Sequence, residues 1–159
     1  MKQNILYLFM AISITVHAQK NKFSFSHTET TTATAEQIWQ IWTDVPNWKQ
    51  WDNGLQNAEL HGEFSVGTKG KLIPDKGPKA SFVITQFEQN KSYTFKTRIP
   101  FGWLVIERTL VENEEDVNFT HHVAFTGLLK KFFYKKLGKR YKEMLPQVMR
   151  EIKIIAEKK

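Results

Sequence analysis

Residues 129–155 carry one long apolar stripe, and it follows directly on a run of strand-like segments. Its members step by three or four residues, the spacing of one face of an α-helix: Leu129, Phe133, Leu137, Tyr141, Met144, Val148, Ile152 and Ile155. About 30 residues of helix would be about 45 Å long, and Pro146 inside it predicts a kink. Such a helix must bury its stripe, and the preceding residues offer only a sheet to bury it against.

The residues before this stripe read as consecutive β-strands joined by short turns. The first strand is expected at residues 23–29, where polar and apolar residues alternate, and the following run Thr30-Thr31-Thr32 is expected to end it. The further candidates are 58–62, 68–73, 80–89, 92–99, 103–111 and 117–126. The turn-forming sequences between them predict one antiparallel, strongly curved sheet.

A short helix is predicted between the first two strands. Thr34 and Gln37 have the spacing of a capping box, and Trp39 and Trp42 follow at helical spacing before Pro46. Residues 44–51 are expected to lack regular structure and to wrap Trp48 and Trp51 over a hydrophobic edge. The order of strand, short helix, antiparallel strands and long helix predicts an α+β fold.

Residues 1–18 have the layout of a secretory signal peptide. Lys2 is followed by an apolar run over residues 5–16, too short to span a bilayer, and Ala18 suits a cleavage site. We therefore expect an exported protein, periplasmic or extracellular, with a single domain over residues 19–159. The alternative is a buried first helix or an uncleaved anchor.

Composition excludes several classes of protein. With 41% hydrophobic residues and 25% charged residues, the chain is neither disordered nor of low complexity. The absence of cysteine rules out disulfide frameworks, thiolate zinc sites and cysteine nucleophiles. No phosphate-binding glycine loop or serine-nucleophile motif is present.

The net charge of +7 is concentrated at the C-terminal end, where residues 130–159 hold 11 Lys and Arg against 3 Asp and Glu. Three interpretations stay open: a solvated helix face, a peripheral contact with an anionic membrane, and nucleic acid, which is disfavoured because no recognition motif is present. The candidates for membrane contact are Lys130, Lys131, Lys135, Lys136, Lys139 and Arg140.

Residues 34–51 (TAEQIWQIWTDVPNWKQW) resemble the opening helix and tryptophan-rich loop of the START-like, or SRPBCC, superfamily. The closest resemblance is to its polyketide cyclase/dehydrase and lipid-transport group. The Gly67-Thr68 turn, the late strands and the terminal helix follow the family's order, so the resemblance covers about residues 26–157. It implies a helix-grip fold, in which a curved sheet grips the last helix around an apolar cavity. Family members include ligand carriers, cyclase-like and hydrolase-like enzymes, and stress proteins.

His121 is the strongest candidate for a polar group inside such a cavity. It shares one face of its predicted strand with Val117, Phe119, Val123 and Phe125; the alternative is a core histidine bonded to a backbone carbonyl. Tyr93 and Glu107 are candidate catalytic partners, although an outward, solvated Glu107 is the ordinary outcome. Both alternating sets of residues 103–111 hold a charge, Glu107 or Arg108, so which of the two faces inward stays open.

The residues expected to contact a ligand are Trp48, Trp51, Tyr93, Phe95, Trp103, Phe119, His121, Tyr141 and Met144. No metal site is expected, because the neighbours His121 and His122 point to opposite faces of a strand, and no cofactor is expected. The chain is expected to be a monomer that binds a small hydrophobic or lipid-like molecule, with transport of that molecule as an extension of binding. A cyclase- or hydrolase-type enzyme using His121 and a ligand-free structural or stress-response domain are the alternatives.

Overall fold

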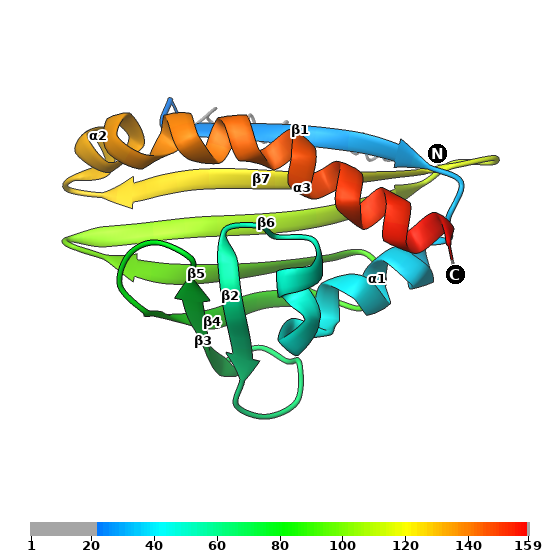
Figure 1. Ribbon diagram of the computed structural model, residues 1–159, viewed down its shortest axis with the longest axis horizontal. Helices are drawn as coiled ribbons and strands as arrows, with labels where there is room; N and C mark the ends of the chain where they lie inside the picture. The colour runs from blue at the N-terminus through cyan, green and yellow to red at the C-terminus, as the bar shows by residue number, and fades with distance from the viewer. Residues whose placement is uncertain (1–21, 159) are drawn as a thin grey trace, which may run out of the picture.

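Seven antiparallel strands form one curved sheet in the order β1-β7-β6-β5-β4-β3-β2 (Figure 1). The computed structural model describes residues 22–158. The strands are β1 (Ser24–Thr31), β2 (Leu55–Leu60), β3 (Lys69–Pro74), β4 (Ala80–Glu88), β5 (Ser92–Ile99), β6 (Gly102–Glu112) and β7 (Val117–Gly127). Every pair of neighbouring strands except the β1–β7 pair is consecutive in the chain, because short turns return each strand beside its predecessor.

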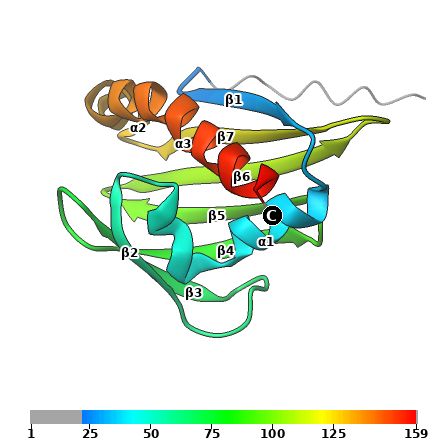
Figure 2. The same ribbon diagram turned by 45° about the vertical axis from the view of Figure 1, so that its right-hand side comes forward.

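The helices lie on one face of this sheet. They are α1 (Ala35–Thr43), the 3₁₀-helix η1 (Val45–Gln50) and a C-terminal segment made of α2 (Lys130–Phe133), the π-helix η2 (Tyr134–Gly138) and α3 (Lys139–Glu157). Figure 2 shows the C-terminal segment crossing the sheet and ending beside α1. The predicted α+β helix-grip fold, with a Trp-bearing helix after the first strand, is confirmed.

Two local predictions were wrong. Thr30 and Thr31 do not end the first strand but continue it, paired with Asn118 and Val117, because β-branched residues suit an extended backbone. Residues 45–50 are not irregular but form η1, with Pro46 in its first turn. Backbone N–H groups in the first turn have no acceptor within the helix, so proline, which lacks this N–H, is tolerated there. The predicted capping box of α1 is present at Thr34 and Gln37.

The π-helix explains the spacing at the start of the apolar stripe. Leu129, Phe133, Leu137 and Tyr141 step by four residues three times in succession, and each step exceeds an α-helical turn of 3.6 residues. The wider turn of η2 takes up this excess and keeps the stripe facing the sheet. Further along, Pro146 lies inside α3, and Figure 1 shows the helical segment changing direction along its length.

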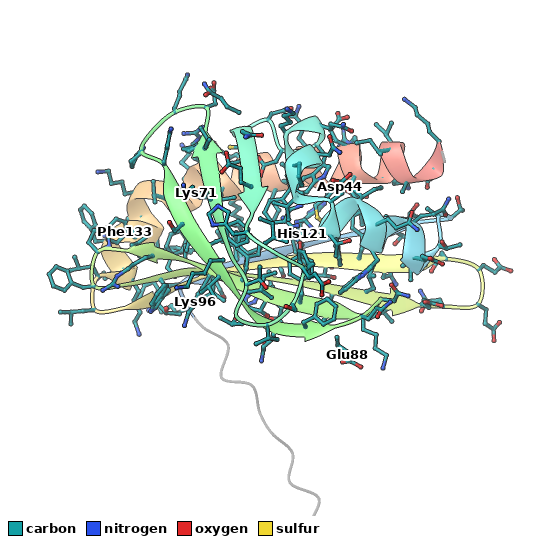
Figure 3. All side chains as sticks on the ribbon, turned by 90° about the horizontal axis from the view of Figure 1, so that it is seen from below. Asp44, Lys71, Glu88, Lys96, His121 and Phe133 are labelled. Atoms are coloured by element: carbon teal, nitrogen blue, oxygen red, sulfur yellow. The ribbon has the colours of Figure 1, made fainter. Side chains whose placement is uncertain are left out.

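The inner face of the sheet is defined by the register of β6 and β7. Phe119, His121, Val123 and Phe125 of β7 stand opposite Leu110, Arg108, Ile106 and Leu104 of β6, and opposed residues share a face. This face packs against α1, η1 and α3. The outer face carries Trp103, Glu107 and His122, and Figure 3 shows Lys96 on the side of the sheet away from the helices.

The predicted signal peptide, residues 1–18, lies outside the described residues, so export stays a prediction. Among residues 22–158, no helix combines the length and the apolar character needed to cross a bilayer.

Candidate functional site

A small cavity lies between the inner face of the sheet, the connection after η1, and α3. Its volume is about 50 Å³. The sheet contributes Ile106, Arg108, His121 and Val123, the connection contributes Trp51 and Asp52, and α3 contributes Tyr141, Met144, Leu145 and Val148. The lining therefore combines one cation, one carboxylate, a histidine and a phenol with aromatic and aliphatic side chains.

Arg108 is the charged group at the centre of this site. It is 3% exposed because strand alternation places it on the inner face between Ile106 and Leu110. Its guanidinium lies against two indole rings, 4.7 Å from the ring centroid of Trp48 and 4.8 Å from that of Trp51. Such cation–π contacts offset part of the free energy needed to bury a charge.

The hydrogen bonding of Arg108 is incomplete. Its Nη1 donates to the hydroxyl of Tyr93, which in turn donates to the carbonyl of Trp42 at 3.2 Å. Its Nε is buried and has no hydrogen-bond partner, and no carboxylate among residues 22–158 forms an ion pair with it. A buried charge without a carboxylate partner is rare in proteins, which marks Arg108 as a candidate binding group.

Burial changes the acid–base behaviour of the groups around Arg108. Desolvation lowers the pKa of Arg108 itself, yet a guanidinium stays charged in proteins. Desolvation also raises the pKa of Tyr93 to about 12, so this phenol is neutral at physiological pH. The site thus holds one fixed positive charge beside a neutral hydroxyl donor.

His121 lies directly opposite Arg108 in the register of the two strands. Its ring is 2% exposed and lies 5.3 Å from the ring of Trp42, in the interior between the sheet and the helices (Figure 3). Its Nε2 is buried without a partner. Desolvation, followed by repulsion from Arg108, lowers the pKa of His121 well below its usual value, so the imidazole is neutral at physiological pH.

The cavity meets solvent where half-buried Asp52, Tyr141 and Met144 lie. The carboxylate of Asp52 accepts a hydrogen bond from the Gly54 N–H at 2.9 Å, and desolvation raises the pKa of Asp52. The side chain of Met144 reaches across from α3, since a Cβ placed on Gly54 would lie 2.9 Å from its Cε. A flexible thioether therefore covers the mouth of the cavity.

Four of the predicted ligand contacts lie in the cavity lining: Trp51, His121, Tyr141 and Met144. Four others lie in the core next to it. Trp48 and Tyr93 contact Arg108, Phe95 packs on Trp48 and Phe119 packs on Trp42. These four shape the cavity without lining it.

Trp103 and Glu107 are not part of the site, and the expectation that Trp103 contacts a ligand is corrected. Both lie on the outer face of β6, because residues 103, 105 and 107 alternate with the inward residues. The ring of Trp103 lies under Lys96 Nζ at 4.4 Å. Glu107 lies 3.5 Å from His122 and on the other face of the sheet from His121, so Glu107 and His121 do not form an acid–base pair.

Arg108 and Asp52 are the functional candidates that sequence reasoning did not select. For Arg108 the sequence did hold a signal of its inward position. The alternating set of residues 103–111 that contains Arg108 also contains Leu104, Ile106 and Leu110, and it is more aliphatic than the set that contains Glu107. Asp52 follows η1 in a connection without periodicity, and only the fold brings it to the cavity. Among the described residues, no three histidine or acidic side chains gather into a metal site.

Comparisons with known structures agree with this fold. A hypothetical protein from Helicobacter pylori, jhp0584, has a TM-score of 0.71 and 9% identity, covering 98% of this chain and 99% of that one. The di-domain ARO/CYC StfQ of the steffimycin biosynthetic pathway has a TM-score of 0.70 and 9% identity, over 86% of this chain and 51% of that one. Norcoclaurine synthase from Thalictrum flavum, in complex with dopamine and hydroxybenzaldehyde, has a TM-score of 0.63 and 13% identity, over 85% and 86%.

These identities show a shared fold and no more. No curated protein matches the sequence significantly. A sequence family does match, over residues 22–153, which is nearly all of the described chain. The protein therefore belongs to the polyketide cyclase / dehydrase and lipid transport family.

Proposed function

We propose that the cavity binds the anionic head of a small amphipathic molecule, a carboxylate or an enolate oxygen, on the guanidinium of Arg108. The observation that carries this proposal is the buried Arg108, which lines the cavity and whose Nε has no hydrogen-bond partner. A ligand oxygen would complete its hydrogen bonding and neutralise its charge, and bonds between charged partners are roughly twice as strong as neutral ones.

The rest of the lining suits the apolar part of such a molecule. Ile106, Val123, Leu145 and Val148 offer only hydrocarbon to a ligand, while Trp51 offers a ring face. Binding pockets of this kind combine a mostly apolar wall with a few placed polar groups. Family membership supports the binding of a small hydrophobic molecule, and Arg108 adds a charge requirement to it.

The size of the cavity limits how the ligand fits. A volume of about 50 Å³ accommodates a few water-sized groups, whereas pockets that enclose drug-sized ligands measure about 300–1,000 Å³. A carboxylate head fits inside the cavity, but a long tail does not. We expect the tail to leave through the mouth and to displace Met144, whose side chain has no β-branch to hold it in place.

Three probes of equal chain length test the charge requirement: decanoate, decanol and decylamine. We expect decanoate to bind most tightly in isothermal titration calorimetry, because only its head complements Arg108. Asp52→Asn should preserve or improve decanoate binding, since it removes a like charge from the cavity. If wild type instead bound decylamine most tightly and Asp52→Asn lost this preference, the site would be assigned to cations. If none of the three probes bound, a ligand-free domain would be favoured.

A cyclase-type enzyme is the second candidate function, favoured by the neutral His121 directly opposite Arg108. A neutral imidazole can remove a proton from a carbon next to a carbonyl, and a guanidinium can hold the resulting enolate oxygen. Levulinate, a keto acid, offers both a carboxylate and exchangeable α-hydrogens.

We expect the protein to be a carrier, so levulinate should exchange its α-hydrogens for deuterium no faster with wild type than with His121→Ala, as followed by NMR. General acid–base residues contribute typically ~10²–10⁴-fold in rate. If folded His121→Ala lost exchange to that extent relative to wild type, a cyclase-type enzyme would become the first candidate function and a carrier the second.

A further inference from the structure

Large apolar side chains gather on the surface at one end of the molecule. Phe101, Leu128 and Phe132 are 75%, 82% and 55% exposed, and Leu129 is partly exposed beside them. Two turns come together here, because the Leu128 N–H donates to the carbonyl of Phe101 at 2.9 Å. We call these four residues the apolar tip; Figure 1 shows α2 at this end of the sheet, next to the β5–β6 turn.

The backbone at Phe101 is strained. Its φ is 57°, in the left-handed region where a bulky residue is an outlier that calls for an explanation. A glycine would adopt this conformation without strain, yet the chain places a phenylalanine there and leaves its ring in solvent. Strain of this kind concentrates at functional positions.

Lysines surround the apolar tip. Lys130, Lys131, Lys135 and Lys136 are all exposed, and we call them the tip lysines. No acidic residue occurs in residues 92–106 or 117–142, the segments that build this end. The neighbouring β3–β4 turn holds Asp75 but also Lys76 and Lys79, so it adds net positive charge.

We propose that the apolar tip and the tip lysines dock this protein on the surface of an anionic lipid bilayer. The lysines would lie against anionic headgroups while Phe101, Leu128 and Phe132 enter the boundary with the acyl chains, the arrangement of interfacial amphipathic segments. The apolar stripe of α3 stays buried against the sheet, with Val148 and Ile152 inaccessible. Docking is therefore peripheral and reversible, and it does not depend on which molecule the cavity binds.

Two of the cations expected at a membrane are better assigned elsewhere. Lys139 lies 3.9 Å from Glu143 on the next turn of α3, and Arg140 acts electrostatically on Asp52 at the cavity mouth. A nucleic-acid partner would use the lysines, but it would leave the exposed aliphatic and aromatic side chains without a complement, because phosphates dominate such contacts. The combination of apolar and cationic groups favours a bilayer.

Vesicle flotation of the full chain tests the proposal, comparing pure phosphatidylcholine with phosphatidylcholine containing phosphatidylglycerol. One variant changes the tip lysines to glutamine, and a second is Leu128→Ser with Phe132→Ser. Two matched controls lie away from the tip. The lysine control changes Lys49, Lys69, Lys91 and Lys158 to glutamine, all exposed. The apolar control is Val66→Ser with Val111→Ser, at residues 60% and 56% exposed.

Wild type should float with anionic vesicles only, and less so in high salt, because the Debye length falls from ~10 Å at 0.1 M to ~3 Å at 1 M. About 1 kcal/mol per lysine is about fivefold each, so the tip-lysine variant should lose on the order of a hundredfold or more in partitioning. The serine variant should lose at least about tenfold, and both controls should float like wild type. Equal flotation with neutral vesicles, or equal losses in variant and control, would overturn the proposal. So would a wild-type protein that binds short duplex DNA but does not bind anionic vesicles.

Discussion

Arg108→Met should abolish the preference for decanoate over decanol while leaving the protein as stable as wild type or more so. Truncating one partner of a buried charged hydrogen bond costs about 2–5 kcal/mol of binding, so decanoate should bind about 30-fold more weakly or worse. Decanol, which lacks the charge, should bind about as well as before. Isothermal titration calorimetry on wild type and variant measures both probes.

Arg108→Met should weaken decanoate binding without lowering the stability of the protein, and the reason lies in the surroundings of Arg108. The guanidinium is buried with no carboxylate in ion-pair contact. Its desolvation is only partly offset by the rings of Trp48 and Trp51, the hydrogen bond to Tyr93 and the electrostatic attraction of Asp52. Methionine keeps much of the volume without the charge, and replacing buried charges by apolar groups is often neutral or stabilising. A gain of stability in Arg108→Met together with a loss of decanoate binding would support a binding role for Arg108.

Arg98→Met is the matched control. Arg98 is exposed on the outer face of β5 and lies 5.8 Å from the ring of Trp103, so the same substitution removes the same net charge far from the cavity. Decanoate affinity should be unchanged in this variant. If Arg98→Met and Arg108→Met weakened decanoate equally, the effect would be one of overall charge, and Arg108 would not be the binding group.

The fold could be predicted because its determinants are local in the sequence. Strand alternation, the capping box at Thr34 and the turn residues between strands each act over a few positions. The error at residues 44–51 arose because Pro46 argues against an α-helix but is compatible with the first turn of a 3₁₀-helix.

The site was less predictable because it depends on which face each strand turns inward. On β7 one alternating set is clearly the more apolar, so the inward position of His121 could be predicted. On β6 Glu107 and Arg108 place a charge in both sets, so the more aliphatic neighbours of Arg108 are a weak signal, and pairing with β7 decides between the two faces. Asp52 reaches the cavity from a connection whose path no periodicity describes.

His121 should make the protein less stable in acid. The folded protein keeps the buried His121 ring neutral because burial lowers its pKa well below 6.5, whereas the unfolded chain takes up a proton below about pH 6.5. The unfolded state then binds more protons, so the free energy of unfolding falls by about 1.4 kcal/mol per pH unit as the pH drops below about 6.5.

Urea unfolding at pH 5 and pH 7.5 measures this slope in wild type, His121→Gln and His122→Gln. At pH 5 the His121 contribution amounts to at most roughly 2 kcal/mol. His121→Gln should lose this part of the acid-side decrease, whatever its stability at pH 7.5. His122→Gln is the control for loss of a histidine from the same strand, because His122 lies half-exposed on the outer face beside Glu107. Equal slopes in wild type and His121→Gln would mean that the folded protein protonates this ring. The cavity would then hold a second cation beside Arg108, and the neutral base that the enzymatic alternative needs would be lost.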